Sequence, residues 1–89
     1  MKQDEIERFE EGALALAQAT IQKAMTVEGI TQKGLATRMN RSTTFVKRML
    51  EGDHNLPVKT LAAALACCGY EVRFTLRKLG TKSDDDPEA

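Results

Sequence analysis

Three residues that favour helix ends organise the centre of this sequence. Thr31 and Ser42 are good N-cap residues, and a short run with helical spacing follows each of them. Asn40 lies between the two runs and is one of the few non-glycine residues that tolerates a left-handed backbone. The sequence therefore predicts two short helices, over residues 31–39 and 42–50, joined by a tight turn.

Each of these two helices has an apolar face that can meet the other. The residues expected on the faces are Leu35, Ala36 and Met39 in the first helix, and Val46, Met49 and Leu50 in the second. Ala36 is small, as a close approach of two helices requires. Gly34 costs the first helix about 1 kcal/mol of stability relative to Ala.

Longer helical spacing flanks this pair on both sides. Residues 6–25 place apolar side chains on one face, and Gly29 predicts the helix end. The residues expected to face inward are Ile6, Phe9, Ala13, Leu16, Ala17, Ile21, Ala24 and Met25. Because Gly12 weakens the middle, the segment forms either one long helix or two. Pro57 fits the first position of a later helix that ends at Gly69. Its expected inward residues are Val58, Leu61, Ala62 and Leu65.

The apolar period changes from about 3.6 to 2 in YEVRFTL, residues 70–76, which predicts a β-strand. A single strand leaves its backbone groups unpaired, so the same strand of a second copy is the economical partner. We expect antiparallel pairing over 70–77 in a homodimer, and the alternative is a strand that folds back onto its own helices. The expected dimerisation residues are Tyr70, Val72, Phe74 and Leu76.

Charge is distributed unevenly along a chain whose formal net charge is zero. Residues 31–50 hold five basic residues and no acidic one, whereas residues 1–30 hold six acidic and three basic residues. Residues 80–89 are also acidic overall. A basic stripe of this kind is the electrostatic footprint of a polyanionic partner, although many charge blocks are only solvated faces.

Length and composition indicate one small globular domain. We expect residues 1–79 to form it, with the central helix pair at 31–51, and residues 80–89 to be a disordered acidic tail. No apolar run approaches the roughly 18 residues that span a bilayer. The amino terminus lacks the apolar core of a signal peptide. These features predict a cytoplasmic protein with no membrane partner.

Residues that carry catalysis or bind metals are sparse. His54 is the only histidine, and the adjacent Cys67 and Cys68 form no metal-ligand spacing or disulfide framework. Paired carboxylates in an apolar setting are also missing. We therefore expect no enzyme activity, metal or cofactor. Recognition of RNA or single strands needs stacking platforms, and the three Phe and one Tyr look buried.

Two short helices joined by a tight turn, with a basic second helix, describe a helix-turn-helix. The stretch GITQKGLATRMNRSTTFVKRMLEG, followed by NLPVKTLAAALACCGYEVRFTL, resembles the Cro/CI-like (XRE) helix-turn-helix family. The resemblance covers about half the chain. It implies a mostly α, lambda-repressor-like domain of about four helices. The family's usual last helix is missing here, and the one C-terminal β-strand expected to pair across a dimer stands in its place. Arg41 departs from the family pattern, because an apolar residue is frequent at that turn.

The resemblance implies sequence-specific binding of double-stranded DNA by a transcriptional regulator, a repressor that acts as a homodimer on an inverted-repeat operator. The helix beginning at Ser42 is expected to enter the major groove by its amino end. The implied base contacts are Thr43, Thr44, Lys47 and Arg48, and the implied phosphate contacts are Gln32, Lys33, Arg41 and Ser42. His54 and Asn55 are weaker candidates for backbone contacts. Phe45 is expected to pack on Met49.

Two alternatives keep the same fold. In the first, the protein is the antitoxin of a type II toxin–antitoxin module that also regulates its own operon, and an acidic terminal segment masks a toxin. The acidic ends are compatible with that role or with a solubilising one. In the second, the helix-turn-helix has lost DNA binding and serves as a protein adaptor.

Overall fold

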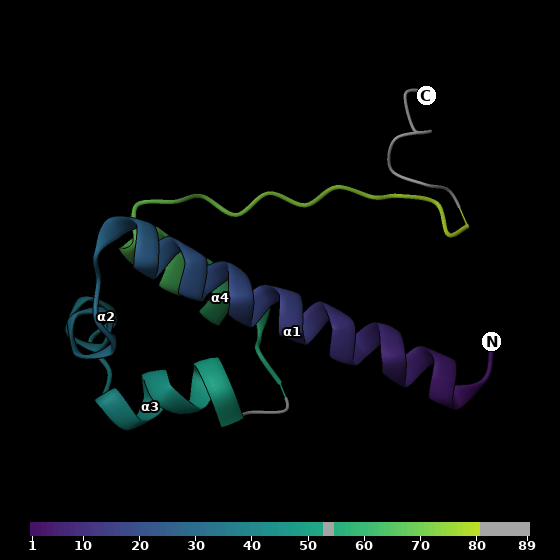
Figure 1. Ribbon diagram of the computed structural model, residues 1–89, viewed down its shortest axis with the longest axis horizontal. Helices are drawn as coiled ribbons and strands as arrows, with labels where there is room; N and C mark the ends of the chain where they lie inside the picture. The colour runs from purple at the N-terminus through teal and green to yellow at the C-terminus, as the bar shows by residue number, and fades with distance from the viewer. Residues whose placement is uncertain (53–54, 81–89) are drawn as a thin grey trace.

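The computed structural model describes residues 1–52 and 55–80 of the chain. In chain order the elements are α1 (Gln3–Glu28), α2 (Gln32–Met39), α3 (Thr43–Lys47), the single π-helical turn η1 (Arg48–Gly52) and α4 (Val58–Cys67). No β-strand occurs within the described residues. They form a small all-α domain of four α-helices (Figure 1), which confirms the predicted mostly helical fold in that form.

Helix α1 runs along the length of the molecule, and only its carboxyl-terminal half carries the other helices (Figure 1). The buried residues of α1 are Ile21, Ala24 and Met25. Phe9 and Leu16 are 55% and 69% exposed, so the expectation that they face a core within this chain is wrong. The same holds for Ile6 and Ala13, which are also exposed. The physical reason is reach, because α2, α3 and α4 are short and gather at one end of α1.

The core draws side chains from every helix. Its buried residues are Ile21, Ala24, Met25, Leu35, Ala36, Val46, Met49, Leu50, Ala64, Leu65 and Cys68. Five of the six residues predicted for the α2–α3 faces are buried, and the sixth, Met39, is half-buried against the same cluster. The described residues include no buried polar or charged side chain. Apolar packing therefore holds the helices together.

The predicted face of α4 is partly wrong. Val58 is 59% exposed and Ala62 is exposed, whereas Ala64 is completely buried. Pro57 is the N-cap rather than the first helical residue, so the helix begins one residue later than expected. The face that meets the core joins Ala64 and Leu65 to Leu61 and Cys68. The inward positions of Leu61 and Leu65 are thus confirmed, and those of Val58 and Ala62 are wrong.

The predicted starts of α2 and α3 are confirmed by their capping hydrogen bonds. Thr31 Oγ1 accepts from Gly34 N at 3.0 Å, and Ser42 Oγ accepts from Phe45 N at 3.0 Å. Asn40 takes a left-handed conformation with φ 61°, as expected for the turn. These local contacts begin α2 and α3 and set the tight turn between them.

Glycine has three different consequences in this domain. Gly29 ends α1 with φ 69°, in the left-handed region where glycine meets no Cβ penalty. Gly12 does not divide α1, which continues through it as one helix. At Gly34 a Cβ atom would lie 3.2 Å from Oγ1 of the capping Thr31. A side chain at position 34 would therefore require the Thr31 side chain to shift by a few tenths of an ångström.

Two sets of polar contacts tie the helices to one another. The Arg38 guanidinium of α2 donates to the Cys67 carbonyl at the end of α4 at 2.9 Å, and Cys67 Sγ lies 3.4 Å from the Arg38 carbonyl. Gln18 of α1 donates through Nε2 to the Met49 carbonyl at 3.1 Å. Each contact satisfies a carbonyl near a helix end, where intrahelical partners run out.

Residues 70–78 leave α4 after the Gly69 turn and run in extended form beside α1 (Figure 1); we call them the C-terminal arm. Tyr70 fixes the start of the arm, because its N–H donates to the Leu65 carbonyl at 2.8 Å and its hydroxyl to Glu28 Oε2 at 2.7 Å. The predicted strand is thus extended but has no ladder partner within the described residues, and its pairing with a second chain stays a prediction. Most of the predicted acidic tail, residues 81–89, lies outside the described residues.

The core makes a direct prediction about stability. Ile21→Ala should lower the free energy of unfolding by about 2–5 kcal/mol, because Ile21 is completely buried and its truncation leaves a cavity. Gln22→Ala, at the exposed neighbouring position, is the control and should change stability by less than about 0.5 kcal/mol. Urea unfolding followed by circular dichroism measures both. Equal stability of the two variants would contradict the assigned core.

Candidate nucleic-acid interface

The turn between α2 and α3 brings the predicted site residues onto neighbouring elements. Seven of them are exposed and Gln32 is half-buried. Arg41 N donates to the Ala36 carbonyl at 2.9 Å, which folds the chain back against the end of α2. Ala36 is 3% exposed at this crossing, in line with the small side chain expected there. The residues of both helices therefore lie in one local unit.

The outward side of α3 is polar and basic. Val46 is completely buried, whereas Thr43, Thr44 and Lys47 are exposed. The α-helical part ends at Lys47, three residues before the predicted end, and the π-helical turn η1 continues from Arg48. This wider turn accompanies the burial of two consecutive side chains, Met49 and Leu50. Arg48 itself is exposed at the start of the turn.

Positive charge gathers at the amino end of α3. The Arg41 guanidinium lies 4.7 Å from the centroid of the Phe45 ring, a cation–π geometry. Phe45 is half-buried against the core, which confirms that it packs inward. The aromatic ring thus holds the Arg41 charge beside the first turn of α3. Arg41 therefore has a defined position in this fold.

The remaining predicted phosphate contacts lie at the first turns of the two helices. Ser42 caps α3 through its oxygen, which leaves its hydroxyl hydrogen able to donate to an outside acceptor. Lys33 is exposed on the first turn of α2, beside Gln32. Of the two weaker candidates, Asn55 lines a groove elsewhere, described next, and His54 lies outside the described residues.

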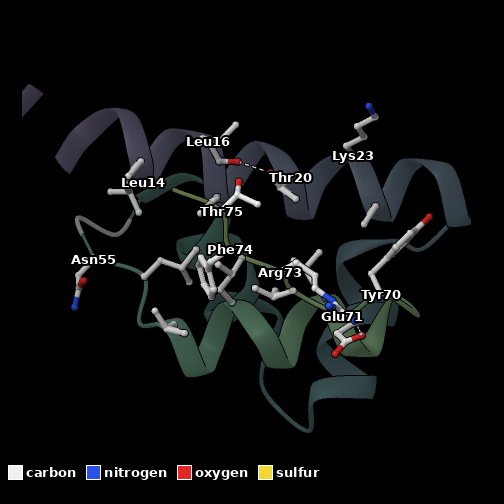
Figure 2. A pocket seen from close by; sticks show the side chains of 18 of the residues that line it. Leu14, Leu16, Thr20, Lys23, Asn55, Tyr70, Glu71, Arg73, Phe74 and Thr75 are labelled. Carbon is white, nitrogen blue, oxygen red and sulfur yellow. Dashed lines mark hydrogen bonds and ion pairs between the residues drawn. The ribbon is translucent and has the colours of Figure 1, made fainter. Parts of the chain in front are cut away.

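A groove that the sequence reasoning missed runs between α1, α4 and the C-terminal arm (Figure 2). Its volume is about 1100 Å³, and its lining is mostly apolar. Phe74 lies between α1 and α4 in Figure 2 and is 70% exposed, and Leu16 and Val58 add further exposed apolar surface. The signal in the sequence was the run ALALA at residues 13–17, which is apolar around the whole helix rather than on one face.

Two titratable groups near the end of α4 have shifted pKa values. The hydrogen bond that Tyr70 donates to Glu28 raises the pKa of the phenol. The neutral phenol is the form that makes this bond, so its contribution to stability holds below the ordinary pKa of about 10 and is lost as the pH rises through the raised value. Burial, followed by the neighbouring Cys67, raises the pKa of the Cys68 thiol.

The described residues contain neither a cluster of metal ligands nor a membrane-spanning helix. Within residues 1–52 and 55–80, no three His, Cys, Asp or Glu side chains gather as metal ligands would. In the same part of the chain, no helix combines the length and apolar character that a membrane crossing demands.

Comparisons with protein-family models, with curated proteins and with solved structures find no match to this chain.

The N-cap of α3 gives a stability prediction that is independent of any ligand. Ser42→Ala should cost about 1 kcal/mol, because the Phe45 amide loses its acceptor. Ser42→Asn keeps a capping oxygen and should remain within a few tenths of a kcal/mol of the parent. Thermal unfolding of the three proteins under one condition measures the difference. If the alanine and asparagine variants melted together, the cap would not support α3.

Proposed function

We propose that this protein binds double-stranded DNA in a sequence-specific manner and acts as a transcriptional repressor. The observation that supports it best is the exposed outer face of α3, where two threonines lie at the amino end of the capped helix and Lys47 lies in its last turn. The major groove admits an α-helix and presents a distinct pattern of donors and acceptors for each base pair. Residues 31–50 hold no acidic residue that would repel the phosphates.

The exposed side chains of α3 have complementary roles in this proposal. Thr43 and Thr44 each offer a hydroxyl to a base edge and a methyl group to a thymine methyl. Lys47 or Arg48 pairs with guanine O6 and N7, a contact that is worth about 1–3 kcal/mol of discrimination per good bidentate pair. Base reading therefore rests on four residues of α3 and η1.

Phosphate contacts orient the domain on the duplex and carry no sequence information. Lys33 and Gln32 are the proposed contacts at the start of α2. Arg41, held against Phe45, and the hydroxyl of Ser42 are the proposed contacts at the start of α3. Basic side chains that contact phosphates release the counterions bound there, so the affinity falls steeply as the salt concentration rises.

The protein acts as a homodimer in this proposal, through its C-terminal arms. The arm and α3 lie on opposite sides of α1 in Figure 1, so a second copy at the arm leaves α3 uncovered. A two-fold dimer then presents two reading helices about 34 Å apart, one turn of DNA, to an inverted repeat.

The test measures affinity for duplexes selected from a random pool, at several salt concentrations. The variant with Lys47→Ala and Arg48→Ala should lose about 2–6 kcal/mol of specific binding free energy, as two reading contacts disappear. A variant with Lys2→Ala and Arg8→Ala is the matched control. It removes the same charge from the far end of α1 and should keep its affinity. Binding by the parent should fall about a thousandfold or more between about 50 and 200 mM salt.

Three results together would support this function: a palindromic selected sequence, the steep salt dependence, and unchanged helical circular dichroism in both variants. Equal affinity of the α3 variant and its control would remove α3 from the interface. A flat salt response would remove the phosphate contacts, and with them DNA as the ligand.

A second role, as the antitoxin of a toxin–antitoxin pair, is favoured by the amino-terminal half of α1. There Phe9 is 55% exposed among carboxylates that include Glu10 and Glu11, an acidic surface with an apolar centre that suits a basic protein. A toxin encoded beside this chain should co-purify with it, and Phe9→Ser should weaken the complex. Ala15→Ser, an exposed change on the same helix, should not. Equal retention by both variants would exclude this surface.

A further inference from the structure

The C-terminal arm is close to self-complementary in both polarity and charge. We propose that the arms of two protomers pair antiparallel in a single register, with Phe74 at the two-fold axis. Glu71 then contacts the partner's Arg77, and this pair of contacts makes a second copy of the chain the preferred occupant. The inference rests on the homodimer proposed above and adds the register and the residues that select the partner.

The arm is available for such pairing. Among residues 70–77, Tyr70 is the only one whose backbone hydrogen-bonds to a helix within the described residues. Phe74 is 70% exposed and Leu76 is completely exposed, so the apolar side of the arm is largely uncovered. Val72 is half-buried against the core, so the apolar side of the arm faces the groove beside α1 at this residue. A second arm placed beside the first would cover more of this apolar surface.

Alternation limits the registers to a few. Successive residues of an extended strand point to opposite faces, and the apolar residues of the arm all have even numbers. The apolar sides of the two arms therefore share a face only when even-numbered residues lie opposite even-numbered residues, so that the numbers of each pair sum to an even value. The two-fold axis then passes through a residue, and the candidates near the middle of the arm are Val72, Arg73, Phe74 and Thr75.

Charge excludes two of these candidates. An axis at Arg73 places this arginine opposite its own copy. An axis at Thr75 places Arg73 opposite the partner's Arg77. Like charges directly opposite one another destabilise an antiparallel pair, so neither register is favoured.

Length favours Phe74 over Val72, since both registers set Glu71 opposite an arginine of the partner. With the axis at Val72 only residues 70–74 pair, because the chain before Tyr70 is committed to α4 and its turn. With the axis at Phe74 the whole arm pairs, residue 70 with residue 78. Glu71 lies opposite the partner's Arg77, Val72 opposite the partner's Leu76, and the two Phe74 rings meet at the axis. Opposite charges therefore flank an apolar centre.

The first experiment exchanges the charges and measures dimerisation by sedimentation without DNA. Glu71→Arg alone and Arg77→Glu alone should each weaken the homodimer about tenfold, since each variant creates two repulsive pairs. A mixture of the two variants restores both attractive pairs. It should therefore form a heterodimer, identified by native mass spectrometry, with an affinity close to that of the parent.

Arg73→Glu is the control, because it reverses a charge on the same face of the arm one pair away, at a residue whose ion pair with Glu71 lies within one chain. In the proposed register Arg73 faces the partner's Thr75, so this variant should give no selective heterodimer with Glu71→Arg. If Arg73→Glu rescued Glu71→Arg and Arg77→Glu did not, the axis would lie at Val72 and the proposal would be overturned. A parent chain that stays monomeric would overturn it as well.

Cross-linking locates the axis independently. Phe74→Cys should form an intermolecular disulfide under a mild oxidant, because the two new thiols meet at the axis. Leu76→Cys, with the same native Cys67 and Cys68 background, should not, because its two copies lie four residues apart along the pair. The opposite pattern would overturn the register. DNA is absent from every readout, so failure to bind DNA would count against the proposed function and leave the register standing.

Discussion

Every feature of this domain depends on burying a small set of apolar side chains at one end of α1. Ile21, Leu35, Val46 and Met49 are the large side chains at its centre, and they come from α1, α2, α3 and η1. A chain of 89 residues has little apolar surface to bury, so each of these side chains carries a large share of the stability. Burial of Val46 also fixes the rotation of α3, which leaves its threonines and Lys47 outside. The same packing that makes the core therefore exposes the candidate interface.

Local signals in the sequence predicted the centre of the fold well. Thr31, Asn40 and Ser42 act through hydrogen bonds and backbone conformations within a few residues, which sequence alone can specify. Features set by distant packing were harder to predict. The phase of α4 depends on which side meets α2, and exposure of Phe9 depends on how far the other helices reach along α1.

The candidate interface was predicted at the level of residues, and its geometry added detail. The stacking of Arg41 on Phe45 and the π-helical turn at Arg48 are both invisible to helical periodicity, since each arises where two elements meet. The groove beside α1 was missed for a related reason. Its walls come from α1, α4 and the arm, and only the folded chain brings them together.

The contacts between Arg38 and Cys67 join α2, which carries part of the candidate interface, to the end of α4. The arm follows α4 after a single glycine turn. In the described part of the chain, these contacts connect the candidate interface to the arm through packed helices. Sliding paired arms by two residues would shift one protomer along the other by about 6.6 Å, close to two base-pair steps. The register of the arms would thus help to set how far apart the two candidate interfaces of a dimer lie.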